Sequence, residues 1–185
     1  YKFNIGKAVP GLELKVLDDG GNEVPAGIEG ELAVNASDGN PILLKEYWKN
    51  PEGTKEKFLG NWMLTGDLVV KDEDDYSTFI SRKDDVIISS GYRIGPVEVE
   101  DTIIKHEAVV EAGVIGAPDE TRGEIVKAFI TLRPGYEPTE SLKTELQNFV
   151  KQRLAKHEYP REIEFIAEIP KTTTGKIRRK DLRRF

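Results

Sequence analysis

The sequence predicts an α+β fold in two parts, and three observations lead to that prediction. Short strand-like segments separated by tight-turn signals fill residues 1–81. Strand-like and helix-like segments then alternate over residues 82–185. The 185 residues are 38% hydrophobic and 32% charged, which is typical of a globular protein. We therefore expect a small β-subdomain followed by a compact mixed α+β domain, with the boundary near residues 80–84.

The first part is predicted to contain four strands and one short helix. LELKVL (12–17) alternates apolar and polar residues and runs into DDGG, which is a turn signal. PEGTKEKF (51–58) is typical of a short helix that opens with proline. The other expected strands are GIEGELAV (27–34), LTGDLVV (64–70) and STFI (77–80). Short strands with tight turns between them predict an all-β unit.

The second part is predicted to mix strands with two longer helices. DDVIISSGYRI (84–94) is an apolar strand interrupted by Gly91, and Pro96 then opens a helix, PVEVEDTIIKHE (96–107). Proline is tolerated there because a first-turn residue needs no N–H. A second helix is expected over 140–157, where apolar residues recur at helical spacing: Leu142, Leu146, Phe149, Val150 and Leu154. The remaining strands are expected at 109–118, 125–132 and 162–170.

Composition excludes several classes of function. The chain has no cysteine, which removes disulfides and thiolate chemistry, and its two histidines argue against a metal cluster. No apolar run approaches the ~18 residues that span a bilayer, and no signal peptide opens the chain. A net charge of −6 argues against general nucleic-acid binding. We expect a cytoplasmic protein, and, since residue 1 is not methionine, a piece of a longer chain.

The end of the chain is basic although the protein is acidic. From Lys171 to the end of the chain there are seven basic residues and one acidic residue, and all but Arg184 lie within PKTTTGKIRRKDLR (170–183). A phosphate-binding loop is excluded, because Pro170 stands where its first glycine is needed and Ile177 where Ser or Thr should follow the lysine. Gly175 permits a tight turn that projects Lys176 outward. The alternative is a solvated basic tail.

Two further segments contain candidate ligand-binding residues. Asp67 ends the apolar stretch LTGD, where a carboxylate can accept two hydrogen bonds from a vicinal diol such as ribose. The alternative is a turn aspartate. Arg82 and Arg93 flank an apolar strand, and arginine suits bidentate contact with phosphate. The alternative for this segment is a salt-bridge network with Asp84 and Asp85.

Taken together and in this order, the motifs identify a family resemblance. TGD (65–67), RKDDVIISSGYRIGPVEVE (82–100) and PKTTTGKIRR (170–179) resemble the C-terminal third of the acyl-adenylate-forming enzymes. Residues 5–34 resemble the β-subdomain that ends the large N-terminal domain of that family. SSGYRIGPVEVE, RGEIVKAF and YPREIEF are most similar to medium-chain acyl-CoA synthetases.

The resemblance implies a two-step reaction with ATP, a small-molecule carboxylate and coenzyme A. ATP, accompanied by Mg²⁺, and the carboxylate form acyl-AMP and pyrophosphate, and coenzyme A then displaces AMP. It also implies that residues 82–185 form a mobile domain that rotates between the steps about a hinge near 82–85. The ATP-phosphate loop, most Mg²⁺ ligands and the acyl pocket would lie in the missing N-terminal domain, so this fragment alone is expected to be inactive.

Residue by residue, the resemblance implies the following roles. Asp67 would bind the ribose hydroxyls, Arg82 would contact the ribose–phosphate region, and Lys176 would be the adenylation lysine. Asp84 stands at the hinge position, and Arg93 would assist phosphate or acyl-site geometry in one conformation. The residues that would bind coenzyme A are Ser90, Gly91, Tyr92, Arg122, Lys151, Tyr159, Pro160 and Arg161.

Three departures from the family pattern leave its charged residues intact: Asp75 and Ser81 stand where glycine is common, and Thr174 where serine is common. The alternatives to a medium-chain enzyme are an acetyl, short-chain or aryl acyl-CoA synthetase, or an adenylation domain that loads a carrier protein. A non-catalytic module whose basic tail docks on nucleic acid is disfavoured by the acidic remainder of the chain.

Overall fold

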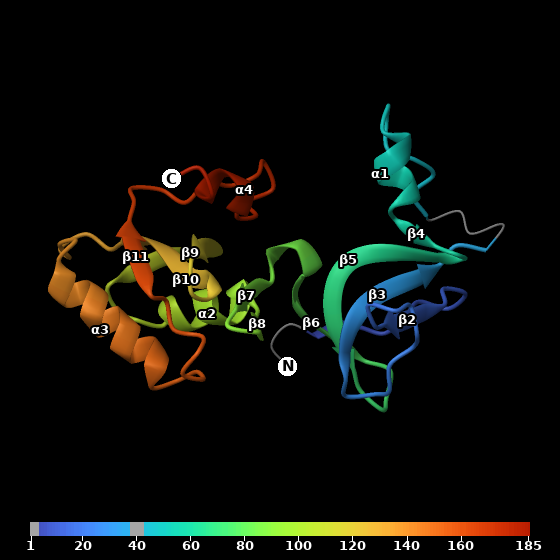
Figure 1. Cartoon of the computed structure of the whole chain (residues 1–185), viewed down its shortest axis with the longest axis horizontal. Coiled ribbons are helices and arrows are strands. Elements are labelled where there is room, and N and C mark those ends of the chain that lie inside the picture. The colour runs from blue at the N-terminus through green and yellow to red at the C-terminus, as the bar shows by residue number, and fades with distance from the viewer. Residues whose placement is uncertain (1–3, 38–42) are drawn as a thin grey trace. The chain divides into compact units, whose positions relative to one another are not determined.

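The computed structural model describes residues 4–37 and 43–185 and confirms the α+β fold class. The chain divides into two compact units, Tyr1–Asp84 and Asp85–Phe185. Each unit is built on one β-sheet, as Figure 1 shows. The two units are described separately below.

The first unit is an antiparallel sheet in the order β1-β6-β5-β3-β2, with β4 paired to β5. Its elements are β1 (Asn4–Gly6), β2 (Leu14–Leu17), β3 (Glu29–Asn35), α1 (Pro51–Lys55), β4 (Phe58–Leu59), β5 (Trp62–Lys71) and β6 (Ser77–Arg82). Val16, Leu32 and Val69 form its buried core. The predicted strands are confirmed, whereas β1 and β4 were not predicted. The predicted helix over 51–58 is wrong at its end, because Phe58 and Leu59 pair with β5.

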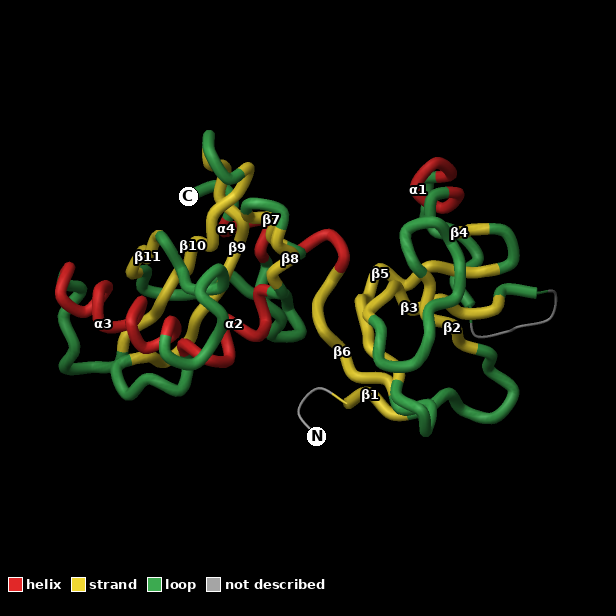
Figure 2. Tube along the Cα trace, turned by 60° about the horizontal axis from the view of Figure 1, so that its bottom comes forward, coloured by secondary structure: helices red, strands yellow, loops and turns green. Residues whose placement is uncertain are grey.

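The second unit is a mixed sheet centred on β10. Its elements are β7 (Ile87–Ser89), β8 (Tyr92–Ile94), α2 (Pro96–Ile103), β9 (Val109–Asp119), β10 (Gly123–Leu132), α3 (Glu140–Lys151), β11 (Glu162–Phe165) and α4 (Arg179–Leu182). β10 is antiparallel to β9 and β7 and parallel to β11. Figure 2 shows β9 and β10 side by side. The helix α4 was not predicted.

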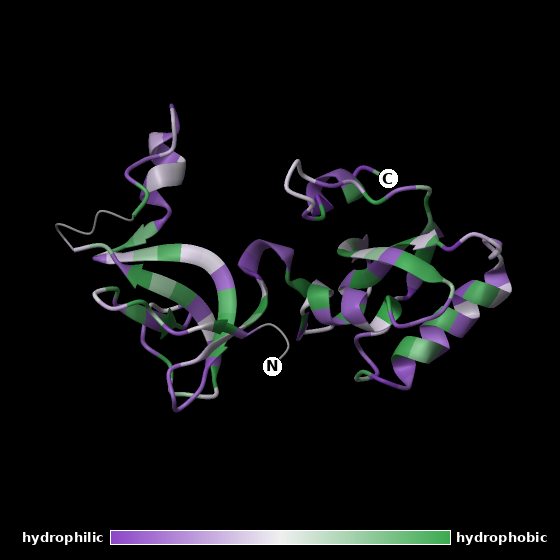
Figure 3. Ribbon diagram, turned by 180° about the vertical axis from the view of Figure 1, so that it is seen from behind, coloured by the Kyte–Doolittle hydropathy of each residue, from purple (hydrophilic) through white to green (hydrophobic). Residues whose placement is uncertain are grey.

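Alternation along β10 divides this unit into two cores. Val126, Ala128 and Ile130 belong to the larger cluster, to which α2 and α3 contribute their apolar faces. Phe129 points the opposite way, since successive strand residues face opposite sides of a sheet, and packs with Ile169 and Leu182. Figure 3 shows the alternating polar and apolar stripes of α3 that match this arrangement.

The strand predicted over 84–94, interrupted at Gly91, is wrong as a single strand: residues 87–94 form two strands of a hairpin. Ser90 and Gly91 are its two turn residues and have φ values of 50° and 83°. Two-residue hairpins of this type need positive φ at both central positions, which glycine adopts without strain. Residues 83–85 precede the hairpin as a single turn of 3₁₀-helix.

Three other elements end earlier than predicted. The helix begun by Pro96 stops at Ile103, because a new turn follows in which the His106 ring accepts the Ala108 N–H. The helix over 140–157 ends at Lys151, although Leu154 still packs against the core from the following turn. The strand over 162–170 ends at Phe165, because Ile169 leaves the ladder for the smaller core.

Candidate functional site

Asp67 and Arg82 lie directly opposite each other on β5 and β6. Arg82 Nη1 donates to Asp67 Oδ1 at 2.8 Å and to the Thr65 carbonyl at 2.9 Å. The side chains of Asp67 and Arg82 are 34% and 39% exposed, so a solute can reach both. Two candidate residues identified from the sequence, 15 positions apart along the chain, are therefore in contact in the fold.

The TGD segment is shaped by three contacts. Gly66 has φ of 79°, and a Cβ there would lie 2.6 Å from Arg82 Nη2, so glycine lets the guanidinium approach the strand. The Gly66 N–H donates to the buried Glu31 carboxylate at 3.0 Å. The Thr65 hydroxyl donates to the Leu32 carbonyl and accepts the Asp67 N–H. These bonds hold the Asp67 backbone in one orientation.

The charges beside this pair belong to the first unit. Arg82 Nε donates to Asp84 Oδ1 at 3.2 Å. Burial lowers the pKa of Arg82, but the hydrogen bond and charge of Asp67 and the charge of Asp84 outweigh it and leave the pKa raised. Lys83 bridges Asp19 and Glu31 at 2.8 Å and 3.0 Å. The hydrogen bond to Asp19 is the largest cause of the raised pKa of Lys83.

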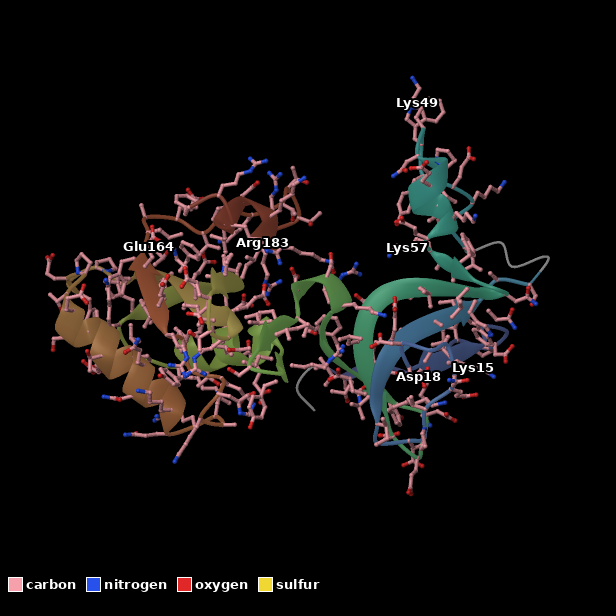
Figure 4. The ribbon with its side chains drawn as sticks, viewed as in Figure 1. Lys15, Asp18, Lys49, Lys57, Glu164 and Arg183 are labelled. Carbon is pink, nitrogen blue, oxygen red and sulfur yellow. The ribbon has the colours of Figure 1, made fainter. Side chains whose placement is uncertain are left out.

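A cavity of about 290 Å³ opens next to these charges. It is lined by Glu31, Lys57, Gly66, Arg82, Lys83 and Asp84. Figure 4 labels Lys57 just beyond α1. The salt-bridge alternative proposed for this segment is confirmed for Arg82 with Asp84, and is wrong for Asp85, which pairs with Arg179 in the second unit.

In the second unit, the β7–β8 hairpin contacts the loop before β10. The Ser90 N–H donates to the Arg122 carbonyl at 2.9 Å, and Arg122 Nη1 donates to the Ser90 hydroxyl at 3.1 Å. The predicted residues Ser90, Gly91 and Tyr92 form the exposed tip of the hairpin. Arg93 follows on β8 with an exposed side chain.

The other predicted coenzyme A residues gather around Tyr159. Lys151 Nζ lies 4.1 Å and the Arg161 guanidinium carbon 5.1 Å from the centre of the Tyr159 ring. Pro160 is buried. The Tyr92 ring stacks on His157 with centroids 4.0 Å apart, which joins the hairpin tip to this segment. His157 was not singled out in the sequence, where a lone histidine carries no pattern.

Lys176 lies in a tight turn after β11. Lys171 and Ile177 form an isolated antiparallel bridge at the base of the turn. The Thr172 N–H donates to the Lys176 carbonyl at 2.7 Å, and the Lys176 N–H donates to the Thr172 hydroxyl at 3.1 Å. Gly175 has φ of 82°, as the predicted tight turn requires. The Lys176 side chain is exposed.

Two features are absent from residues 4–37 and 43–185. In these ranges, no group of three or more His, Asp or Glu side chains could hold a metal ion. Nor does any helix there combine the length and apolar character needed to cross a membrane.

Comparison with known proteins defines the class. Residues 98–176 match the family described as the AMP-binding enzyme C-terminal domain. The chain is 49% identical over 181 residues to the acetyl-coenzyme A synthetase of Bacillus subtilis, covering 97% of this chain and 31% of that protein. It is 47% identical over 184 residues to the mitochondrial acyl-coenzyme A synthetase ACSM3 of Rattus norvegicus, covering 98% and 32%. The chain thus spans about a third of these relatives.

A solved structure shows the same fold. The ATP-bound RpMatB-BxBclM chimera B1 matches with a TM-score of 0.90 and 37% identity, over 98% of this chain and 36% of that one. The chain belongs to the AMP-forming acyl-CoA synthetase family and corresponds to the C-terminal portion of its members.

Proposed function

We propose that this chain is the part of an AMP-forming acyl-CoA synthetase that completes the nucleotide site and carries the moving catalytic lysine. The Asp67–Arg82 pair is the observation that carries the proposal. It places a carboxylate that accepts hydrogen bonds beside a cation, which suits a ribose hydroxyl next to a phosphate. The rest of the nucleotide site would come from the N-terminal domain.

In the first half-reaction, a carboxylate oxygen attacks the α-phosphorus of ATP and pyrophosphate leaves. Asp67 would accept hydrogen bonds from the ribose hydroxyls, and Arg82 would contact the ribose–phosphate region. Lys176 would approach the phosphoryl oxygens, where its ammonium stabilises the negative charge that develops during attack. The closed turn from Thr172 to Lys176 supports this role, because it fixes the backbone from which the ammonium extends.

In the second half-reaction, the coenzyme A sulfur attacks the acyl carbonyl and AMP leaves. Arg122, Lys151 and Arg161 supply cations for the phosphates of coenzyme A. The hairpin tip at Ser90, Gly91 and Tyr92 would line the channel of the pantetheine arm. The domain would turn about Asp84 between the steps, and Arg93 would assist phosphate or acyl-site geometry in one of its two positions.

The substrate is proposed to be a medium-chain carboxylate, on the resemblance of residues 89–100 and 122–129 to that group. Relatives named for acetyl and for broader acyl substrates match equally well, so an acetyl or short-chain enzyme is the second candidate. A carrier-loading adenylation domain is the third, and the cations around Tyr159 favour coenzyme A over it. Mg²⁺ would accompany ATP, with ligands outside this chain. A cytoplasmic location stays a prediction.

The test uses the full-length parent enzyme. Lys176→Ala should slow acyl-AMP formation by about 10²–10³, the usual loss when one preorganised electrostatic donor is removed. Conversion of supplied acyl-AMP to acyl-CoA should stay near wild type. Arg178→Ala is the matched control, because that side chain is 52% exposed and pairs with Asp181 in the same turn. Equal rates of acyl-AMP formation in the two variants would mean that Lys176 is only part of a solvated basic tail.

A panel of carboxylates assayed for AMP release with the same enzyme would separate the three candidates. Release that depends on coenzyme A and is fastest with medium chains supports the first. Release that is fastest with acetate supports the second. Acyl transfer to a carrier protein but not to coenzyme A would contradict both.

A further inference from the structure

Arg179 lies at the centre of a buried charge cluster in the second unit. Its Nη2 contacts both oxygens of Glu100 at 2.8 Å and 2.7 Å, and its Nη1 donates to Asp85 at 3.0 Å. The side chains of Arg179, Glu100 and Asp85 are 12%, 7% and 15% exposed. Arg183, labelled beside α4 in Figure 4, reaches Asp85 at 3.5 Å from the solvent side. Two guanidinium groups therefore neutralise two carboxylates.

The same cluster holds the backbone of β9. Arg179 Nε donates to the Val114 carbonyl at 3.2 Å, and the Val114 N–H donates to Glu100 Oε1 at 2.8 Å. Arg179 thus directs all three of its nitrogens at fixed acceptors in three separate segments. A lysine has one nitrogen and cannot match these directions at once.

Such a cluster is a poor device for stability alone. Removing charges from water costs several kcal/mol per ion, and buried ion pairs often stabilise no more than apolar residues of the same size. Their best-attested use is to select one arrangement among several. The cluster is therefore best explained by the element whose placement it controls.

That element is the turn that carries Lys176. Arg179 follows Lys176 by three residues, and between them Ile177 packs on the smaller core with Leu182. The Arg178 N–H donates to the Pro170 carbonyl at 2.8 Å, which closes the base of the turn. At its other end the cluster reaches Asp85, the first residue of the second unit.

We propose that Arg179 is a positioning residue for Lys176: its ion pairs with Glu100 and Asp85 fix the lysine-bearing turn on the framework of the second unit. Lys176 then moves with the first residue after the interdomain boundary rather than on a flexible tail. The inference rests on the proposed role of Lys176 in acyl-AMP formation.

The experiment compares Arg179→Gln and Arg179→Lys with Arg178→Gln and Lys176→Ala in the full-length parent. Arg179→Gln should lower kcat for acyl-AMP formation by about 10²-fold, since a misplacement of about 1 Å can have that effect. KM for ATP should change less than about twofold, and supplied acyl-AMP should react normally with coenzyme A. Arg179→Lys should fall between Arg179→Gln and wild type, and Arg178→Gln should match wild type.

Amide exchange gives a second measurement of position. The hydrogen-bonded amides of Thr172, Gly175 and Lys176 should exchange faster in Arg179→Gln than in Arg178→Gln, and faster than unfolding of the whole second unit, which the amides of α3 report. If Arg179→Gln does not yield folded enzyme, Arg179→Lys carries both measurements, with slower acyl-AMP formation and faster turn exchange expected.

The outcomes separate the inference from the function on which it rests. Wild-type acyl-AMP formation in Lys176→Ala would overturn the proposed function. A slow Lys176→Ala enzyme with Arg179 variants that match Arg178→Gln would overturn only the positioning role. Equal loss of both half-reactions in the Arg179 variants would also overturn it, because damage to the whole unit does not discriminate between the steps.

Discussion

Asp67 and Arg82 are register partners on β5 and β6, and the guanidinium of Arg82 donates a 2.8 Å hydrogen bond to the carboxylate of Asp67. Burial lowers the pKa of Arg82, but the hydrogen bonds and charges of Asp67 and Asp84 outweigh it and leave the pKa raised. A partly exposed ion pair held by strand pairing is a rigid place from which to bind a ligand.

Asp67→Ala in the full-length parent should raise the KM for ATP about 10- to 100-fold, since hydrogen bonds to charged groups contribute about 1.5–3 kcal/mol. Asp74→Ala is the control, because Asp74 lies in the exposed turn between β5 and β6. Steady-state kinetics at varied ATP measures both variants. Indistinguishable KM values would mean that Asp67 serves only its ion pair with Arg82 and does not bind ATP.

Gly66→Ala should weaken ATP binding by displacing Arg82, whose Nη2 would lie 2.6 Å from the new Cβ. Gly60→Ala is a matched control, because Gly60 also has positive φ but has nothing within 4 Å of such a Cβ. Both should lose about 1 kcal/mol of unfolding free energy from backbone strain. Only Gly66→Ala should raise the KM for ATP, and a similar rise in Gly60→Ala would refute the steric explanation.

Asp84→Pro should preserve acyl-AMP formation and abolish thioester formation. Proline holds φ near −65° and so restricts the torsion that a hinge must change. Asp84→Ala removes the carboxylate that accepts from Arg82 Nε but leaves the torsion free, so it should support both steps. Both half-reactions are measured for each variant. Equal impairment of the two steps by proline would show that residue 84 is not the hinge.

Arg122→Gln should raise the KM for coenzyme A about tenfold, because it removes the cation beside the Ser90 hydroxyl at the hairpin tip. Acyl-AMP formation should be unchanged. Arg133→Gln, beyond the far end of β10, should leave both steps at wild-type rates. A coenzyme A KM that is equal in the two variants would remove Arg122 from the proposed site.

The stability effect of Arg179→Gln should depend on pH. Burial raises the pKa of Glu100 above its usual 4.5, while Arg179 and the Val114 N–H lower it only in part. A raised folded-state pKa means that the contribution of Glu100 to unfolding free energy falls as pH rises from about 4.5 through the raised value. Removing Arg179 raises the pKa of Glu100 further. The pH range over which unfolding free energy is lost therefore extends to higher pH, and the total loss becomes larger.

Urea unfolding of wild type and Arg179→Gln across this range provides the measurement. The difference should be smallest below about pH 4.5, where Glu100 becomes protonated in both the folded and the unfolded chain, and should approach about 3–5 kcal/mol near neutral pH, where an unpaired charge is left buried. Arg178→Gln should show no such trend. A difference in unfolding free energy that is independent of pH would mean that the contribution of Glu100 to stability does not depend on Arg179.

Hydrophobic periodicity and turn-forming residues were enough to predict the main helices and strands. The ends of several of these elements depended on contacts with residues far away in the sequence. Strands were expected over 109–118 and 125–132, where β9 and β10 lie, because alternation is a local property of the sequence. The two-residue form of the hairpin at Ser90 and Gly91 was missed, because a glycine within an apolar run signals either a bulge or a turn. The end of β11 at Phe165 depends on Ile169 joining a core formed by residues far away in the chain.

The sequence by itself determined the family, since the motifs TGD, RKDD and TTTGK and their order along the chain can be read without any knowledge of tertiary contacts. It also identified Asp67, Arg82 and Lys176 as candidate residues of the nucleotide site. It could not distinguish Arg178 from Arg179, because two adjacent arginines in a basic tail have the same local pattern. Only the tertiary structure decided that one is half-exposed beside Asp181 and the other is buried between Asp85 and Glu100. Burial depends on which distant carboxylates the fold brings to a residue, and local sequence does not encode that.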